Sequence, residues 1–550
     1  MYCGVEYATM KFDNITIVLG EFGKYQRILY VCVCVPIIFT AIQILASVFT
    51  LALPKHRCTI PSLENDTYEV QGIWHELLIN KYIPRSTDGS LAYAACAIYL
   101  SHANTSYNEQ GVPLNSSTAE CDSWVYEKAT FKSTFFTKIN LVCGEDLARA
   151  NANMALLVGH LVGAVSIGLV SDMFGRKKAL VVAIVFFIVA AFGTAFARTY
   201  EVFVGFRFMQ GVANLGMYTT LFVIGLELVG PSYRVAAGII INFFWCFGLY
   251  ALCLIAFLVR SWYPLQLALA CPSVILILHI WVLPESPRWL MSKGRFQEAN
   301  RILHKCAKVN GVTLPDDLLS NDIDDNTNTS QSVLKMFTVP RLLLRTLIIY
   351  FNWMVVNIVY YGLSLNVGNL SGDIYVNFTI TSTMELGAYI MCLLLLNKVG
   401  RKSLHAGTMI LGGVSCLCTI FSTLYAPPEQ EWITVVLANV GKFGISAAFA
   451  IIYVWSSELF PTLVRHSGIG SSSMVGIVGT ILSPYTMELG NLIPGNFGKA
   501  LPLIIFGGLS VAAGMLSLLL PETKGTVLPE SVRDAEKFGR QSRLKRALTS

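Results

Sequence analysis

The sequence predicts an all-α membrane protein with twelve transmembrane helices in two pseudo-symmetric bundles of six. Three observations lead there: the composition, the number of apolar stretches, and motifs that recur in the same order. Of 550 residues, 54% are hydrophobic and only 13% are charged, against about 25% charged residues in an average soluble domain. The formal net charge of +6 therefore concerns orientation in a lipid bilayer, and no nucleic-acid partner is expected.

Twelve apolar stretches have the length of about 20 residues that crosses a bilayer. We place them at 28–50, 149–170, 179–197, 202–226, 235–258, 262–283, 344–363, 376–397, 403–424, 432–453, 466–487 and 500–520. The first stretch is too long for the core of a signal peptide and is read as a helix that stays in the membrane.

Paired motifs divide these stretches into two halves, which is the pattern of an internal duplication. The sequence Gly-Arg-Lys occurs at 175–177 and 400–402, a Glu followed seven residues later by Arg occurs at 227 and 458, and Pro-Glu-Ser/Thr occurs at 284–286 and 521–523. The expected organisation is an N-terminal segment 1–27, a first bundle 28–284 with a loop at 55–148, a linker 285–343, a second bundle 344–522 and a tail 523–550.

Basic residues of the short loops set the expected orientation, because the side richer in Lys and Arg is normally cytoplasmic. The Gly-Arg-Lys side carries most of them. We therefore expect a multi-pass plasma-membrane protein with both termini and the linker in the cytoplasm.

The loop 55–148 is expected outside the cell. It carries glycosylation sequons at Asn65, Asn104 and Asn115. It also carries Cys58, Cys96, Cys121 and Cys143. Four cysteines in an oxidising compartment predict two disulfides in one of three pairings.

Signatures of catalysis are missing from the sequence. There is no phosphate-binding glycine loop and no serine nucleophile elbow, and the zinc-like start His75-Glu76 has Ile79 where a second histidine would be needed. We expect no enzyme activity, no metal site and no cofactor, and no pattern identifies a sodium site.

Glu385 is the acidic residue that lies deepest in a predicted span. Charges facing hydrocarbon are costly, so this carboxylate needs a reason. It could be a structural hydrogen-bonded group, or a counter-charge for a cationic substrate or a proton. The second reading is favoured by aromatic side chains in neighbouring spans, whose faces attract ammonium groups. They are Tyr218, Trp245, Trp353, Tyr360 and Tyr361. Asn242 is a polar candidate for the same cavity.

Lys442 is the basic counterpart within the tenth span. It could balance the charge of Glu385, or receive a substrate carboxylate. If both charges face one cavity, a zwitterion fits.

Charged residues of the paired motifs lie at the cytoplasmic ends of the spans. They are Asp172, Arg176, Glu227, Arg234, Glu285 and Arg288 in the first half, and Arg401, Glu458, Arg465 and Glu522 in the second. Ion pairs among them would bias a two-state rocking equilibrium and so act as a cytoplasmic gate. The alternative is that they only fix the topology.

The motifs SDMFGRKK, PESPRWL, YYGLSLNVGNLSGDIYVN, GKFGISAAF and SELFPTLVR, together with LGEFGKYQR before the first span, resemble the major facilitator superfamily. The similarity is to its organic cation, anion and zwitterion transporters, and most to the organic cation and carnitine branch. This resemblance implies the major facilitator fold. It also implies cation recognition by Glu385 and a cavity lined by Tyr218, Asn242, Trp245, Trp353 and Tyr360. The sequence departs from the family at Ile477, where cation transporters have Asp and anion and carnitine transporters have Arg.

The expected function is alternating-access transport of small organic cations or zwitterions, including carnitine-like compounds. Two alternatives remain open at this point. One is an organic anion exchanger, and the other is a substrate-sensing or adaptor protein on a transporter scaffold.

Overall fold

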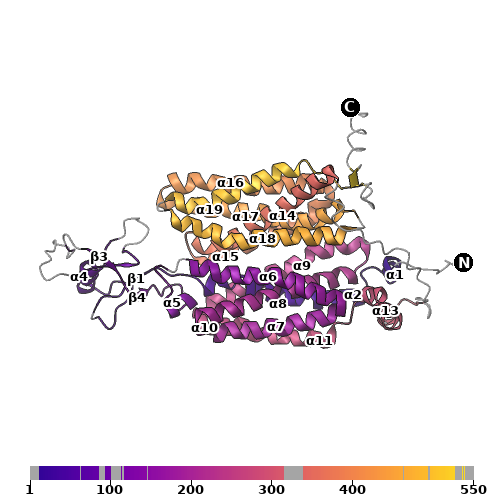
Figure 1. Cartoon of the computed structure of the whole chain (residues 1–550), viewed down its shortest axis with the longest axis horizontal. Helices are drawn as coiled ribbons and strands as arrows, with labels where there is room; N and C mark the ends of the chain where they lie inside the picture. The colour runs from indigo at the N-terminus through magenta and orange to yellow at the C-terminus, as the bar shows by residue number, and fades with distance from the viewer. Residues whose placement is uncertain are drawn as a thin grey trace, which may run out of the picture.

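The computed structural model describes residues 12–61, 63–85, 93–100, 113, 117–144, 147–314, 339–461, 464–493, 496–526, 535–536 and 538. Two helical bundles lie side by side, the N-terminal half in indigo to magenta and the C-terminal half in orange to yellow (Figure 1). A small domain made from the first loop projects from one end of the bundles. Helices of the N-terminal segment and of the linker lie at the other end.

The first half crosses the bundle six times. Its long helices are α2 (Lys24–Leu45) with α3 (Ser47–Thr50), α6 (Leu147–Phe174), α7 (Arg176–Phe196), α8 (Tyr200–Leu228), α9 (Arg234–Leu258), and the segment α10 (Trp262–Ala270), η2 (Cys271–Leu278) and α11 (His279–Val282). The last crossing is not one continuous α-helix. Pro272 has no backbone N–H to donate, and the chain continues from Cys271 as a 3₁₀ helix.

The second half repeats the plan with α14 (Pro340–Asn366), α15 (Ile374–Val399), α16 (Arg401–Tyr425), α17 (Trp432–Leu459), α18 (Arg465–Leu492) and α19 (Asn496–Ser517). Eleven helical segments among the described residues are long and apolar enough to cross a membrane. The predicted span 466–487 is the exception, and it corresponds to α18. This helix is rich in Gly and Ser in its first half, and it lies against α6 between the two bundles (Figure 1). The fold is the predicted twelve-helix arrangement, with one crossing protected by protein contacts rather than by its own hydropathy.

Glycines end helices at the same place in both halves. Gly175 separates α6 from α7 with φ of +111°, and Gly400 separates α15 from α16 with φ of +107°. Residues that have a side chain rarely adopt such backbone angles, so glycine is favoured at both turns. The duplicated Gly-Arg-Lys motif is thus a helix break followed by the first turn of a new helix.

The loop domain, residues 55–144, is held by two short antiparallel ribbons and two disulfides. Strand β1 (His56–Cys58) pairs with β4 (Trp124–Tyr126), and β2 (Ala97–Tyr99) pairs with β3 (Thr118–Glu120). The disulfides join Cys58 to Cys121 and Cys96 to Cys143. This is one of the three pairings that the sequence allows, and it ties both ribbons together around the helix α4 (Ile73–Tyr82).

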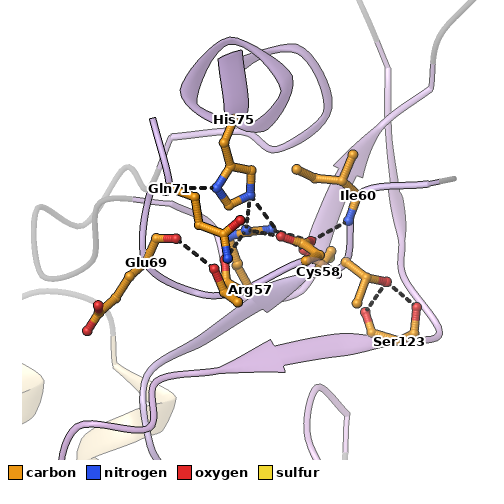
Figure 2. Close-up of polar contacts among 10 residues, drawn as sticks. Arg57, Cys58, Ile60, Glu69, Gln71, His75 and Ser123 are labelled. Atoms are coloured by element: carbon orange, nitrogen blue, oxygen red, sulfur yellow. Dashed lines mark hydrogen bonds and ion pairs between the residues drawn. The ribbon is translucent and has the colours of Figure 1, made fainter. Parts of the chain in front are cut away.

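A buried ionic cluster forms the polar centre of the loop domain (Figure 2). Arg57 and Asp66 form a two-pronged pair at 2.6 and 3.0 Å, and the side chains are 0% and 2% exposed. His75 Nε2 lies 3.0 Å from Asp66 Oδ1. Burial favours the neutral acid, but the hydrogen bonds from Arg57, from the Ile60 N–H and from His75 outweigh it and lower the pKa of Asp66.

Three helices pack together at the opposite end. They are α1 (Phe12–Val18), α12 (Pro287–Ser292) and α13 (Phe296–Asn310). Ile15 and Leu19 of the first segment pack on Leu303 of α13. The side chain of Asn310 links this layer to the first span, since it accepts from the Tyr25 N–H and donates to Gln26.

Candidate substrate-binding site

A cavity lies between the two halves. Six of the nine predicted binding residues line it: Tyr218, Asn242, Trp245, Tyr360, Tyr361 and Ile477. The first three come from α8 and α9 of the first half, and the others from α14 and α18 of the second. A site between pseudo-symmetric halves is the arrangement expected of an alternating-access carrier.

Glu385 lies behind the cavity wall. Its side chain is 1% exposed, and Oε1 accepts hydrogen bonds from the hydroxyls of Tyr360 at 2.5 Å and Tyr389 at 2.8 Å. Both tyrosines line the cavity. Two tyrosines of the cavity wall are thus hydrogen-bonded to the carboxylate behind them. Their hydroxyl oxygens keep lone pairs that can accept further hydrogen bonds.

Lys442 forms an ion pair with Glu385, with Nζ 3.2 Å from Oε2. The same ammonium donates to Ser364 Oγ at 2.6 Å and lies 3.4 Å from the centroid of the Tyr360 ring. Neither Glu385 nor Lys442 is among the residues lining the cavity. Their charges cancel, so the wall of the cavity is polarised but carries no net charge from this pair.

Trp353 also lies outside the cavity lining. Its indole N–H donates to Ser456 Oγ at 2.9 Å. Its ring packs edge-on against the ring of Tyr453, with 4.4 Å between the ring centroids. Tyr453 lines the cavity in its place. The three predicted aromatic residues of α14 are thus divided, with Tyr360 and Tyr361 at the cavity and Trp353 in the layer behind.

The N-terminal wall offers aromatic and polar groups. The rings of Tyr218 and Trp245 pack edge-to-face, with 6.3 Å between their centroids. Asn242 donates to Gly238 O of its own helix at 3.2 Å. Trp245 Nε1, His160 Nε2 and Asn214 Oδ1 are buried and have no hydrogen-bond partner within the described part of the chain.

Several lining residues were not predicted from the sequence: Asn214, Tyr389, Phe449, Tyr453, Ser473 and Thr480. Tyr389 could have been found, because it follows Glu385 by four residues and so shares its helix face. The aromatic residues of α17 carry no comparable signal. His160 of α6 is 2% exposed and also lies at the cavity wall.

The predicted gate residues form one cluster at the end of each half. In the first half, Arg176 pairs with Asp172 at 2.8 Å and with Glu227 at 3.6 Å. Glu285 accepts from the backbone N–H of Arg176 at 2.8 Å and of Lys177 at 3.2 Å. The carboxylate of Glu285 therefore caps the start of α7, where the helix dipole favours negative charge.

The second cluster repeats this geometry. Arg401 pairs with Glu458 at 3.0 Å, and the carboxylate of Glu522 accepts from the N–H groups of Arg401 and Lys402 at 3.0 Å each. The side chain of Arg465 lies outside the described residues. Every ion pair that the structure describes among these gate residues joins helices of the same half.

Arg234 departs from the repeat, because its partner is in the N-terminal segment. It pairs with Asp13 of α1 at 2.5 Å. Arg288 is exposed, and its charge also acts on Asp13. Burial opposes ionisation of Asp13, but its hydrogen bond with Arg234 and the charges of both arginines outweigh it, so its pKa is lowered.

Of the three sequons, only Asn65 falls among the described residues, and it is exposed on the loop domain. Asn104 and Asn115 lie outside the described residues.

Two bundles of six helices, with a cavity between them and matching clusters at their ends, define a membrane carrier. The sequence matches the family described as "Sugar (and other) transporter" over residues 94–534. It is 36% identical to an organic cation transporter protein of Drosophila melanogaster, over 97% of this chain and 96% of that protein. It is 34% identical to the human organic cation/carnitine transporter 2, over 95% of this chain and 93% of that protein.

Among solved structures, the proton:xylose symporter XylE resembles the chain with a TM-score of 0.54 and 21% identity, covering 72% of this chain and 91% of XylE. That similarity concerns the fold alone. The chain belongs to the major facilitator superfamily and, within it, to the organic cation, anion and zwitterion transporters, most like the organic cation and carnitine branch.

Proposed function

We propose that this protein carries small organic cations or zwitterions, including carnitine-like compounds, across the membrane by alternating access. The observation that carries the proposal is the buried carboxylate of Glu385 at an aromatic cavity between the two halves. Aromatic faces attract ammonium groups by about 0.5 to 2 kcal/mol each. They fix no hydrogen-bond geometry, so the site should tolerate ammonium ligands of different shapes.

The polarity of the wall supports an ammonium ligand. Tyr360 and Tyr389 direct their protons to Glu385, so their oxygens are left as acceptors and the carboxylate strengthens their partial negative charge. Lys442 already holds an ammonium against Glu385 and the ring of Tyr360. A ligand ammonium would find the same partners, and a ligand carboxylate would find Lys442.

The proposed setting is the plasma membrane, with the loop domain outside and both termini inside. This orientation places Asn65 and both disulfides in an oxidising compartment where glycosylation also occurs. The carrier would need no cofactor and perform no catalytic step. Facilitated, exchange and sodium-coupled transport are alternatives that the sequence leaves open.

The test is uptake of choline, carnitine and para-aminohippurate into proteoliposomes, by the wild-type protein and by Glu385→Gln. We expect the wild type to take up choline or carnitine. We expect the uptake rate of Glu385→Gln to be at least about tenfold lower than that of the wild type. Because the variant leaves Lys442 buried without its counter-ion, which costs about 3 to 5 kcal/mol, the double variant Glu385→Gln/Lys442→Met is measured beside it. The double variant should fold normally, and its uptake of choline and carnitine should still be lost.

Glu429→Gln is the matched control, since it removes an exposed carboxylate of the same half. Undiminished choline and carnitine uptake by the double variant would contradict the proposal. Uptake of para-aminohippurate alone by the wild type would indicate an anion exchanger. Binding of these compounds without any flux would indicate a sensor or adaptor.

A further inference from the structure

An ion pair joins the two halves at the loop-domain end of the bundles. Arg149 of α6 donates from Nη2 and Nε to Glu488 Oε1 of α18, at 2.8 and 3.0 Å. The side chain of Glu488 is 7% exposed and that of Arg149 is 29% exposed. These residues are 339 positions apart in the chain, and neither belongs to the duplicated motifs or to the central cavity.

This pair lies on the wall of a second cavity, which we call the vestibule. Both halves and the loop domain line it, with Ser47 and Asn153 from the first half, Asn369 and Glu488 from the second, and Lys55 and Glu127 from the loop domain. Its lining shares no described residue with the central cavity. Both cavities are lined by α6 and α18, so the vestibule follows the central cavity along the same pair of helices.

The contact between α6 and α18 must break whenever the carrier opens toward the loop domain, because these helices belong to opposite halves. A neutral contact beside the ion pair would break too, since Tyr485 donates to Asn151 at 2.8 Å. Separation leaves a carboxylate on one wall and a guanidinium on the other. Opening toward the loop domain admits water to both charges, and a ligand that enters through the vestibule can then contact each of them.

We infer that the vestibule is a second substrate site, selective for zwitterions, in which Glu488 binds the ammonium end of the ligand and Arg149 binds its acidic end. A zwitterion can contact both charges at once and so bridge the two walls of the opened vestibule. A simple cation offers no group that the guanidinium of Arg149 can bind. A simple anion offers no group that the carboxylate of Glu488 can bind. The site therefore ranks ligands by the presence of both charges before they reach the central cavity.

The chemistry of the two side chains fits these roles. Arginine presents a planar fork of N–H donors that matches a carboxylate or phosphate in two-point geometry. A carboxylate accepts from primary ammonium groups and attracts quaternary ones through charge alone. The inference rests on the proposed function, since it requires the protein to transport ammonium compounds.

The experiment compares two probes that share a quaternary ammonium, carnitine with a carboxylate and choline without one. Their KM values are measured for uptake by the wild type, Arg149→Met, Glu488→Gln and the charge-exchanged variant Arg149→Glu/Glu488→Arg. We expect Arg149→Met to raise the KM for carnitine about tenfold, the loss expected for one charge-assisted contact, and to leave the KM for choline within about twofold. Glu488→Gln should raise both KM values.

The charge-exchanged variant guards against misfolding, because it keeps an ion pair at the same place. It should restore surface expression and the preference for carnitine, since a zwitterion can bind it in the reverse orientation. Arg198→Leu, which removes an exposed arginine from the turn between α7 and α8, is the control for a general effect of charge loss.

The outcomes separate the two proposals. Equal changes of both KM values in Arg149→Met would show that the pair only closes the bundle, which overturns the inference and leaves the proposed function standing. Wild-type uptake of choline without carnitine would do the same. Wild-type uptake of neither probe would overturn the proposed function and the inference with it.

Discussion

At the scale of single residues, three buried carboxylates of this carrier each form an ion pair with an arginine or a lysine. Glu385 with Lys442, Arg149 with Glu488, and Arg57 with Asp66 each bring one carboxylate to one base. A buried ion pair adds little net stability, but removal of one partner is costly because the other charge stays buried. The three pairs therefore respond to substitution in different ways, according to what else can reach the charge that remains.

Asp66→Asn tests the pair that no ligand can reach. It leaves Arg57, whose side chain is fully buried, without a carboxylate, and we expect a loss of about 3 kcal/mol of unfolding free energy. The sequon at Asn65 is kept, so the glycan serves as an internal check. The measurement is thermal unfolding and limited proteolysis of the full-length protein in detergent. Asp122→Asn, an exposed change in the same domain, should have no effect, and equal stability of the two variants would contradict the prediction.

The pH dependence of this pair follows from the lowered pKa of Asp66. A carboxyl group with a pKa below its value of 3.8 in the unfolded chain stabilises the fold above that value. The contribution is lost as the pH falls through the folded-state pKa. We expect the loop domain to keep its protease resistance from neutral pH to about pH 5 and to lose it only below about pH 4. A loss of resistance near pH 6 would contradict this assignment.

The sequence identifies residues whose chemistry is rare in their setting. Glu385 and Lys442 could be predicted because a charge inside a span needs a reason. The pairing of Arg149 with Glu488 could not be, because each residue stands near the end of its helix and only the folded chain brings them together. Tyr453 and Phe449 were missed for a different reason, since aromatic residues are common in membrane helices and burial does not distinguish packing from lining.

At the scale of helices, hydropathy alone does not identify every membrane-spanning helix. The spans were predicted from hydropathy. In the described part of the chain, eleven of the twelve corresponding helices are long and apolar enough to cross a membrane. The remaining helix, α18, lines both cavities and lies between the halves. Its Gly and Ser residues lower its hydropathy and allow close contact, as at Gly479, where an added Cβ would come within 2.3 Å of Met354 O.

The glycine before α16 provides a prediction at this scale. In Gly400→Ala the new Cβ would lie 2.7 Å from Glu522 Oε2, at a φ of +107° that side chains rarely adopt. We expect destabilisation by about 1 to 3 kcal/mol together with loss of the cap that Glu522 provides. The measurement is the melting temperature and surface expression of the variant. Gly407→Ala is the matched control in the same helix, because nothing lies within 4 Å of its Cβ. Equal behaviour of the two variants would show that the cap is not needed.

At the scale of the whole molecule, the ion pairs that the structure describes among the gate residues tie helices within a half. The contacts Arg176–Asp172 and Arg401–Glu458 would thus fix the shape of each bundle end. If the halves rock as units, these clusters set how well the ends fit together. This is consistent with a gate, and also with the alternative that they only fix topology.

Asp172→Asn separates these alternatives. Its carboxylate is 74% exposed and contacts Arg176 only at the surface, so folding should be preserved. As a gate residue, it should lower the maximal transport rate several-fold and leave KM within about twofold, because the central cavity is untouched. Glu298→Gln breaks an exposed ion pair on α13 and serves as the control. An unchanged rate at normal expression would leave topology as the role of the cluster.

The contact of Lys442 with Glu385 and the ring of Tyr360 has a consequence for selectivity against small inorganic ions. In the function that we propose, Lys442 is an intramolecular competitor for a cationic ligand at Glu385, and it is present at high effective concentration because it is part of the chain. A ligand must displace it, so a bare ion that offers only charge gains little over the resident ammonium. An organic ligand adds contact area with the surrounding rings and can exceed it. In this proposal, the poor binding expected of bare inorganic ions follows from a resident side chain whose ammonium group resembles that of the substrate.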